Sequence, residues 1–178
     1  CERKSRTSSA GSFSRRSISV SVTPGTPPAL PALTLGATVS GTLASAAQRD
    51  GYAFTLGAAT RVAFDALTNN GSLRWTLTGP RGTEVSSRTF TTSDSYDGYG
   101  VLELPAGDYV LTVHGAASAY SFRLSDLATA TAFTPGTPVS GTLDPANGSS
   151  YYRFDATAGD RFHFSITERS GGDPFWRL

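Results

Sequence analysis

The sequence lacks the features that mark several common classes of protein. Cys1 is its only cysteine, so no disulfide bond can form within the chain. No apolar run approaches the roughly 18 residues of a membrane-spanning helix, and no secretory signal peptide is present. No segment has a convincing helical period, and methionine is absent altogether. The chain is therefore expected to be a mature product or a fragment, built without long helices.

Charge of one sign is also scarce. The net charge is +1, so the molecule as a whole has no field that would select nucleic acid or an acidic membrane. Basic and aromatic residues do not interleave as they do on nucleic-acid-binding surfaces, and no nucleic-acid partner is expected. The one basic cluster lies within the first sixteen residues, and it is either a solvated tail or a docking patch for a polyanion.

From Leu35 onward, apolar and polar residues alternate with a period of two. This alternation indicates strands with one buried face. Turn signals such as "NNG", "GPRG" and "PAGD" separate the strands at spacings of roughly ten residues. The pattern predicts an all-β protein of about eight short strands, folded as an antiparallel β-sandwich. The residues expected on the buried faces include Tyr52, Phe54, Leu56, Leu73, Trp75, Leu77, Tyr109, Leu111, Val113, Tyr120, Phe122 and Leu124.

An internal repeat divides the chain. Shifting the sequence by one hundred residues aligns the pentapeptide at 39–43 with its copy at 139–143, and the aromatic residues that follow stay in the same alternation phase. We therefore expect a Ser/Arg/Pro-rich tail and linker over residues 1–33 and a first β-sandwich over 34–127. A linker over 128–136 then leads into an incomplete second copy over 137–178.

The second copy has the apolar face of the first but only about half of its length. Its expected buried face consists of Tyr152, Phe154, Phe162, Phe164 and Trp176. Trp75 and Trp176 occupy equivalent positions, and both are expected in a core rather than on a ligand-binding surface. Without an opposing sheet, the second copy should be weakly ordered or sticky. The natural chain is accordingly expected to continue past Leu178.

Three motifs resemble the bacterial pre-peptidase C-terminal (PPC) domain family. They are the "VSGTL" strand followed by an aromatic pair, the "LRWTLTGPRGTEV" hairpin and the "LPAGDYVLTVHG" strand. The resemblance covers residues 37–125 fully and 137–178 partly. Gly79 stands where the family usually has aspartate, and Asp50 before the aromatic pair becomes Ser149 or Ser150 in the second copy. The resemblance implies a jelly-roll-like β-sandwich in secreted bacterial proteins, some of which bind calcium or a polymeric substrate.

No catalytic constellation is apparent. The only histidines are His114 and His163, and their alternation phase places both on outer faces. Neither lies beside a nucleophile signature such as GxSxG. We expect no catalytic residues, no cofactor other than calcium, and no enzymatic activity in these residues.

The loop "TSDSYDGYG" carries the best candidates for a binding site. Asp94 and Asp97 would supply carboxylates to a calcium ion, although a plain solvated loop is the simpler explanation of both. Tyr96 and Tyr99 would contact a sugar or a protein, unless Tyr99 packs beneath the loop.

Two interpretations of Cys1 stay open. It is either the lipid-modified first residue of a surface lipoprotein, followed by a polar tether, or simply a fragment boundary. The function expected is that of non-catalytic modules in a secreted or cell-surface protein, for spacing, stabilisation or attachment to an extracellular polymer or protein. The alternatives are the accessory region of a secreted peptidase and a lipoprotein or adhesin anchored through Cys1.

Overall fold

The computed structural model describes residues 28–94 and 100–178, and it confirms the all-β antiparallel sandwich. Eight strands build it: β1 (Thr38–Leu43), β2 (Asp50–Leu56), β3 (Thr60–Ala66), β4 (Leu73–Gly79), β5 (Gly82–Thr89), β6 (Val101–Leu104), β7 (Gly107–Gly115) and β8 (Ser118–Asp126). Two single 3₁₀ turns, η1 (Phe90–Thr92) and η3 (Leu127–Thr129), accompany them. Two short strands follow, β9 (Thr131–Ala132) and β10 (Tyr152–Arg153).

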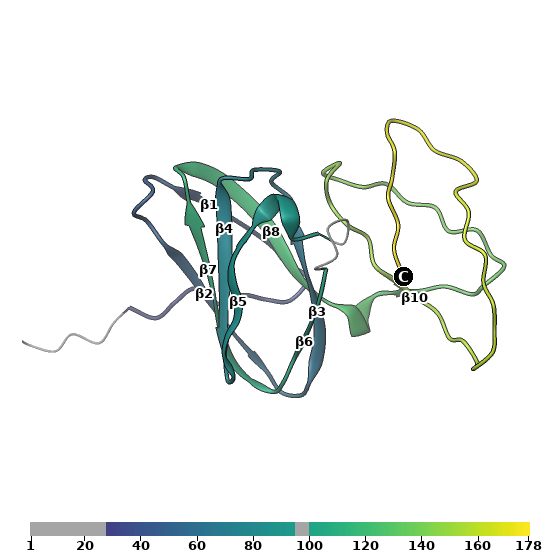
Figure 1. Cartoon of the computed structure of the whole chain (residues 1–178), viewed down its shortest axis with the longest axis horizontal. Coiled ribbons are helices and arrows are strands. Elements are labelled where there is room, and N and C mark those ends of the chain that lie inside the picture. The colour runs from purple at the N-terminus through teal and green to yellow at the C-terminus, as the bar shows by residue number, and fades with distance from the viewer. Residues whose placement is uncertain (1–27, 95–99) are drawn as a thin grey trace, which may run out of the picture.

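The eight strands form two four-stranded sheets packed face to face (Figure 1). One sheet has the order β1-β8-β3-β6 and the other the order β2-β7-β4-β5. Every pairing within these sheets is antiparallel. Consecutive strands therefore often lie in opposite sheets, and the connections close the sandwich at both ends.

Aromatic rings fill the space between the sheets. Phe64 of β3 stacks on Trp75 of β4 with ring centroids 4.1 Å apart, which joins the two layers directly. Phe122 of β8 stacks on Phe64 at 5.0 Å, and Phe90 meets Phe64 edge-on at 5.3 Å. In β2, β4, β7 and β8, the residues that the alternation predicts to face inward are buried. The exception is Tyr52, which is partly buried against the core. Offset-stacked and edge-on aromatic pairs of this kind add to the stabilisation that burial alone provides.

The segment before β1 belongs to the sandwich as well. The amide of Leu33 donates to the carbonyl of Ala53 at 2.8 Å, and the amide of Ala53 donates to the carbonyl of Pro31 at 2.9 Å. These bonds add a short stretch of chain to the β2 edge, and Leu33 is only 6% exposed. The sandwich thus begins a few residues earlier than the composition of the chain indicates.

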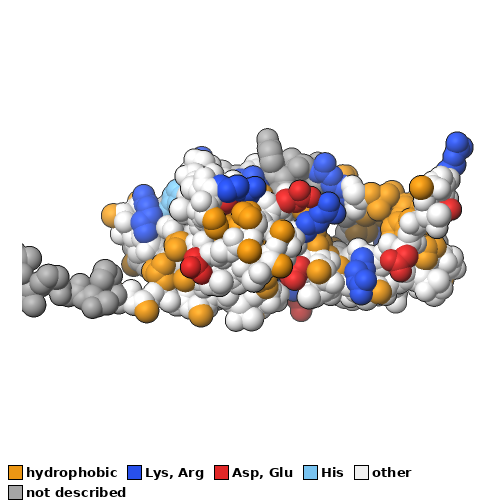
Figure 2. Space-filling view, turned by 90° about the horizontal axis from the view of Figure 1, so that it is seen from below, with side chains coloured by type: hydrophobic (Ala, Val, Ile, Leu, Met, Phe, Trp, Pro, Cys, Tyr) orange, Lys and Arg blue, Asp and Glu red, His pale blue; other side chains and the backbone are white. Residues whose placement is uncertain are grey.

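Residues 137–178 contain only β10 as regular structure, paired in parallel with β9. Phe162 is 40% exposed and Phe175 61% exposed. The prediction that Trp176 is a core residue is wrong, since it is 50% exposed. The ring of Trp176 contacts that of Phe164, with centroids 5.3 Å apart, and no second sheet covers this pair among the described residues. Hydrophobic side chains accordingly gather at the end of the molecule where this segment lies (Figure 2).

Backbone turns recur at the spacing of the sequence repeat. The amide of Ala37 bonds to the carbonyl of Thr34 at 3.2 Å, and Thr137 bonds to Thr134 at 3.1 Å. Gly36 and Gly136, inside these turns, have positive φ angles of 79° and 87°. A second pair of turns, Ser45–Gln48 and Pro145–Gly148, closes with bonds of 3.1 Å and 2.7 Å. The Phe164–Trp176 contact likewise parallels the Phe64–Trp75 stack.

Candidate functional site

Of the loop residues expected to bind a ligand, Asp94 is the one that the structure describes. Its carboxylate accepts a hydrogen bond of 2.8 Å from the amide of Ala66, at the end of β3. Asp94 therefore ties the loop after η1 to the neighbouring strand. Asp97, Tyr96 and Tyr99 lie outside the described residues, as does Cys1.

The "VSGTL" motif is explained by a tyrosine that lies over its glycine. A Cβ atom on Gly41 would come within 2.3 Å of Tyr120 Oη, so only glycine leaves room for the ring. Tyr120 donates to Asp50 Oδ2 at 2.7 Å, and Tyr52 donates to Tyr120 Oη at 2.5 Å. Gln48 holds the other carboxylate oxygen at 2.7 Å. Burial and these bonds raise the pKa of Tyr120. Asp50 is thus committed to hydrogen bonds within the sandwich.

The "PAGDY" motif has a similar structural role. Tyr109 Oη donates to the carbonyl of Pro105 at 2.7 Å, which fixes the turn between β6 and β7. The ring of Tyr109 lies over Gly79, where an added Cβ atom would be 2.2 Å from Tyr109 Cε1. This contact gives the physical reason for glycine at this position of the hairpin.

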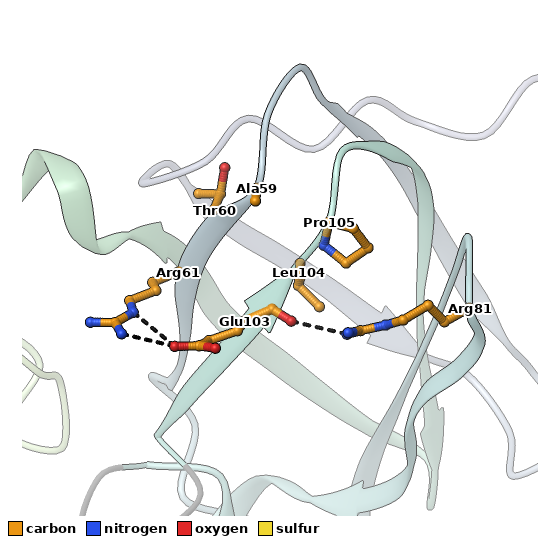
Figure 3. A pocket seen from close by; sticks show the side chains of 7 residues that line it. All are labelled: Ala59, Thr60, Arg61, Arg81, Glu103, Leu104 and Pro105. Atoms are coloured by element: carbon orange, nitrogen blue, oxygen red, sulfur yellow. Dashed lines mark hydrogen bonds and ion pairs between the residues drawn. The ribbon is translucent and has the colours of Figure 1, made fainter.

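An open hollow lies beside the β6–β7 turn, lined by Arg61, Arg81, Glu103 and their neighbours (Figure 3). Arg61 and Glu103 form an ion pair of 2.9 Å in which both side chains are about 70% exposed, at 71% and 72%. Arg81 donates to the carbonyl of Glu103 at 2.9 Å and pairs with Glu84 at 2.6 Å. The guanidinium of Arg81 lowers the pKa of Glu84. These charges are engaged with one another, and surface pairs of this kind contribute little stability.

His114 lies on the outer face of β7, as the alternation predicts, whereas His163 lies outside the strands of residues 137–178. His114 is half-buried beside Thr76, whose hydroxyl is 3.3 Å from His114 Nε2. Its partial burial lowers its pKa, and nearby Arg49 and Arg74 act in the same direction. His163 is exposed.

A charged cluster that the sequence analysis missed lies on the outer face of β3 and β8. Asp65 is fully buried, and its Oδ2 accepts from Arg123 Nη2 at 2.6 Å and from Nε at 3.0 Å. The second carboxylate oxygen, Oδ1, accepts from the amide of Ser149 at 3.0 Å. Burial raises the pKa of Asp65, and the bonds to Arg123 and Ser149 oppose that rise. Ser149, beyond the linker that follows β8, thereby contacts a buried charge of the sandwich.

The sequence of β3 carries a partial signal for this cluster, because Asp65 is the one charged residue in the apolar run 62–67. In the structure, Ala63 and Asp65 are buried together with the core-facing Val62, Phe64 and Ala66. A strand buried on both faces needs a cover on its outer side, and a charged residue within such a strand needs a partner. The residues that cover the outer side of β3 lie more than eighty positions further along the chain.

Within residues 28–94 and 100–178, no three His, Cys, Asp or Glu side chains are grouped as a metal site. No helix in this part of the chain is long and apolar enough to cross a membrane.

No protein-family model and no curated protein matches the chain. Several solved structures are similar to it, among them the following two. The PPC domain of a collagenase from Bacillus anthracis is 18% identical with a TM-score of 0.42, over 58% of this chain and 99% of that domain. PliG of Salmonella Typhimurium, a periplasmic inhibitor of g-type lysozyme, is 25% identical with a TM-score of 0.41, over 53% of this chain and 95% of the inhibitor.

Proposed function

We propose that this chain is a tandem β-sandwich module of a secreted or cell-surface bacterial protein. Its role is non-catalytic, to space, stabilise or attach the domains or polymers on either side of it. The observation that carries the proposal is the use made of its interior polar groups. Asp50, Asp65 and Asp94 each accept hydrogen bonds that join one segment of the chain to another. These three carboxylates, a type of group that enzymes use in catalysis, are thus engaged in hydrogen bonds that hold the chain together.

The recurrence of local structure supports the tandem arrangement. The turns at 34–37 and 134–137 have the same hydrogen bond and the same left-handed glycine. The apolar face of the second copy presents aromatic residues at the positions that form the core of the first. We therefore propose that residues 137–178 are the first half of a second module. Modules connected in this way act as a linear spacer.

Two assays on the purified chain test the proposed role. Chromogenic esters, chromogenic glycosides and labelled casein are offered as substrates, with His114→Ala and His163→Ala as matched variants. The proposal predicts no turnover above buffer. Turnover that disappears in either variant would overturn it. Sedimentation with insoluble peptidoglycan, chitin or collagen then separates the two non-catalytic roles: retention on one polymer selects attachment, and recovery in the supernatant selects spacing.

A further inference from the structure

We propose that the outer face of β3 and β8 is a docking site for the turn that opens the second repeat, and that this joint fixes the orientation between successive modules. The inference rests on the proposed spacer function and specifies that the spacer is stiff. It assigns the Asp65–Arg123 pair to recognition of a neighbouring module.

The receptor side of the joint is preformed by the sheet. Asp65 and Arg123 are directly opposite each other in the β3–β8 register, so their side chains meet on the outer face. Arg123 binds one carboxylate oxygen through two nitrogens, which leaves Oδ1 free to accept from another donor. The carbonyl of Ala66, one residue further along β3, provides a second acceptor at the same place.

The docking segment is the Pro145–Gly148 turn with Ser149 directly after it. Asn147 Nδ2 donates to the carbonyl of Ala66 at 2.7 Å, and the amide of Ser149 donates to Asp65 Oδ1 at 3.0 Å. Arg123 Nη2 lies 3.3 Å from the carbonyl of Ser149, so the pair binds both the donor and the acceptor of one residue. Gly148 is buried in this contact, with Leu67 beside it.

The chain on either side of the turn is tied down as well. The amide of Thr131 donates to the carbonyl of Tyr151 at 3.1 Å, and Phe133 donates to Arg153 at 2.9 Å. The linker after β8 is therefore paired with the strand that follows the turn. In Figure 1 the second segment lies beside the side of the sandwich that carries β3. Contacts on both sides of the linker oppose hinge motion between the repeat and the sandwich.

Burial makes this contact selective. A buried carboxylate that loses one of its partners is left with an uncompensated charge, which is costly. Asp65 is 0% exposed with the turn in place, so undocking must rehydrate both the aspartate and its arginine. Another segment would fit only if it offered an amide donor to Asp65 and a side-chain donor to Ala66 at the same spacing.

The joint also has a direction. In the first repeat, Ala47 stands at the position of Asn147, and its neighbour Gln48 bonds within its own module to Thr42 and Asp50. In the second repeat, Ser165 stands at the position of Asp65. The first module therefore carries the receptor and the second carries the turn, so the order of the two modules is specified.

Amide hydrogen exchange in the full chain, followed by NMR, tests the joint. Asn147→Asp places a second carboxylate against Asp65 and the Ala66 carbonyl, without altering the sandwich. We expect the Ser149 amide to be protected in the wild type and to exchange about 10- to 100-fold faster in this variant, because its bond is to a charged acceptor. The amide of Leu111, in the core strand β7, should exchange at an unchanged rate. Ser150→Asp, which adds the same charge at an exposed position, is the matched control and should leave Ser149 protected.

Equal Ser149 exchange in the wild type and Asn147→Asp would overturn the joint. Acceleration by Ser150→Asp to the same extent would also overturn it, since a general charge effect would then suffice. Asp65→Asn examines the contact from the receptor side and should accelerate Ser149 similarly. The exchange experiment and the substrate assays test different claims. Fast Ser149 exchange without substrate turnover would leave a spacer whose modules are connected flexibly. Substrate turnover with a protected Ser149 amide would overturn the spacer function but not the joint.

Discussion

Glycine and tyrosine determine much of the fold at the scale of single residues. Gly41 admits the ring of Tyr120, and Gly79 admits the ring of Tyr109. Tyr109 donates a hydrogen bond to the backbone carbonyl of Pro105, and Tyr120 donates one to the carboxylate of Asp50. Both glycines are therefore packing requirements. A larger residue at either position should displace the tyrosine ring that lies over it.

Gly41→Ala tests this requirement. The new methyl group would meet a buried hydroxyl that is itself hydrogen-bonded, so overpacking should lower the free energy of unfolding by about 1–3 kcal/mol. Gly57→Ala is the control, because nothing lies within 4 Å of its added Cβ atom. It should change the stability by no more than roughly 0.5 kcal/mol. Urea unfolding of both variants measures the difference, and equal stabilities would contradict the close-contact explanation.

Asp94→Ala distinguishes a structural carboxylate from a metal ligand. The substitution leaves the buried amide of Ala66 without its partner, which should cost about 1–3 kcal/mol whether calcium or a chelator is present. Asp155→Ala, at an exposed position, should have little effect. Thermal unfolding in both media provides the measurement. A loss of stability that occurs only with calcium would instead assign Asp94 to an ion.

At the scale of elements, the predictable part of the fold is the part in which one face of a strand is buried. Alternation predicts Trp75, Leu111 and Phe122 in the core correctly because each is buried between two less buried neighbours along its strand. The same rule failed for Trp176, since alternation specifies which side chains share a face but not what covers that face. The burial of Asp65 is not predictable for the converse reason: its cover comes from Ser149, which no local pattern connects to β3.

The contact between the second repeat and β3 should also be visible in an alkaline titration. Burial, followed by the charge of Asp65, raises the pKa of Tyr151 from its ordinary value of 10.0 to about 12. A raised folded-state pKa favours the neutral phenol. Its contribution to stability is complete below pH 10 and is lost as the pH rises from about 10 to about 12.

The wild type should therefore lose roughly 1–3 kcal/mol more between these pH values than Tyr151→Phe, which has no phenol to ionise at this position. Tyr152→Phe, at the exposed neighbouring residue, is the control and should follow the wild type. Urea unfolding at several pH values gives the comparison. Identical losses in the wild type and Tyr151→Phe would show that the docked turn does not bury the tyrosine.

At the scale of the whole molecule, the chain combines a finished sandwich with a segment whose apolar face is open. The sandwich buries its aromatic residues between two sheets, whereas Phe162, Phe175 and Trp176 of the second segment remain 40–61% exposed. An exposed apolar group of this size marks a surface that another segment should cover. The order that the second segment does have comes from β9, β10 and the contact at Asp65. Its position relative to the sandwich therefore depends on a few polar contacts.

The measurement that tests this account most directly is ¹⁵N relaxation of the full chain in solution. If the repeat and the sandwich form one stiff unit, the amides of β7 and those of residues 147–153 should report a single rotational correlation time. Asn147→Asp should separate the two groups, with faster local motion confined to the second. Two correlation times in the wild type would contradict the account, because the modules would then move independently and could not serve as a spacer of fixed geometry.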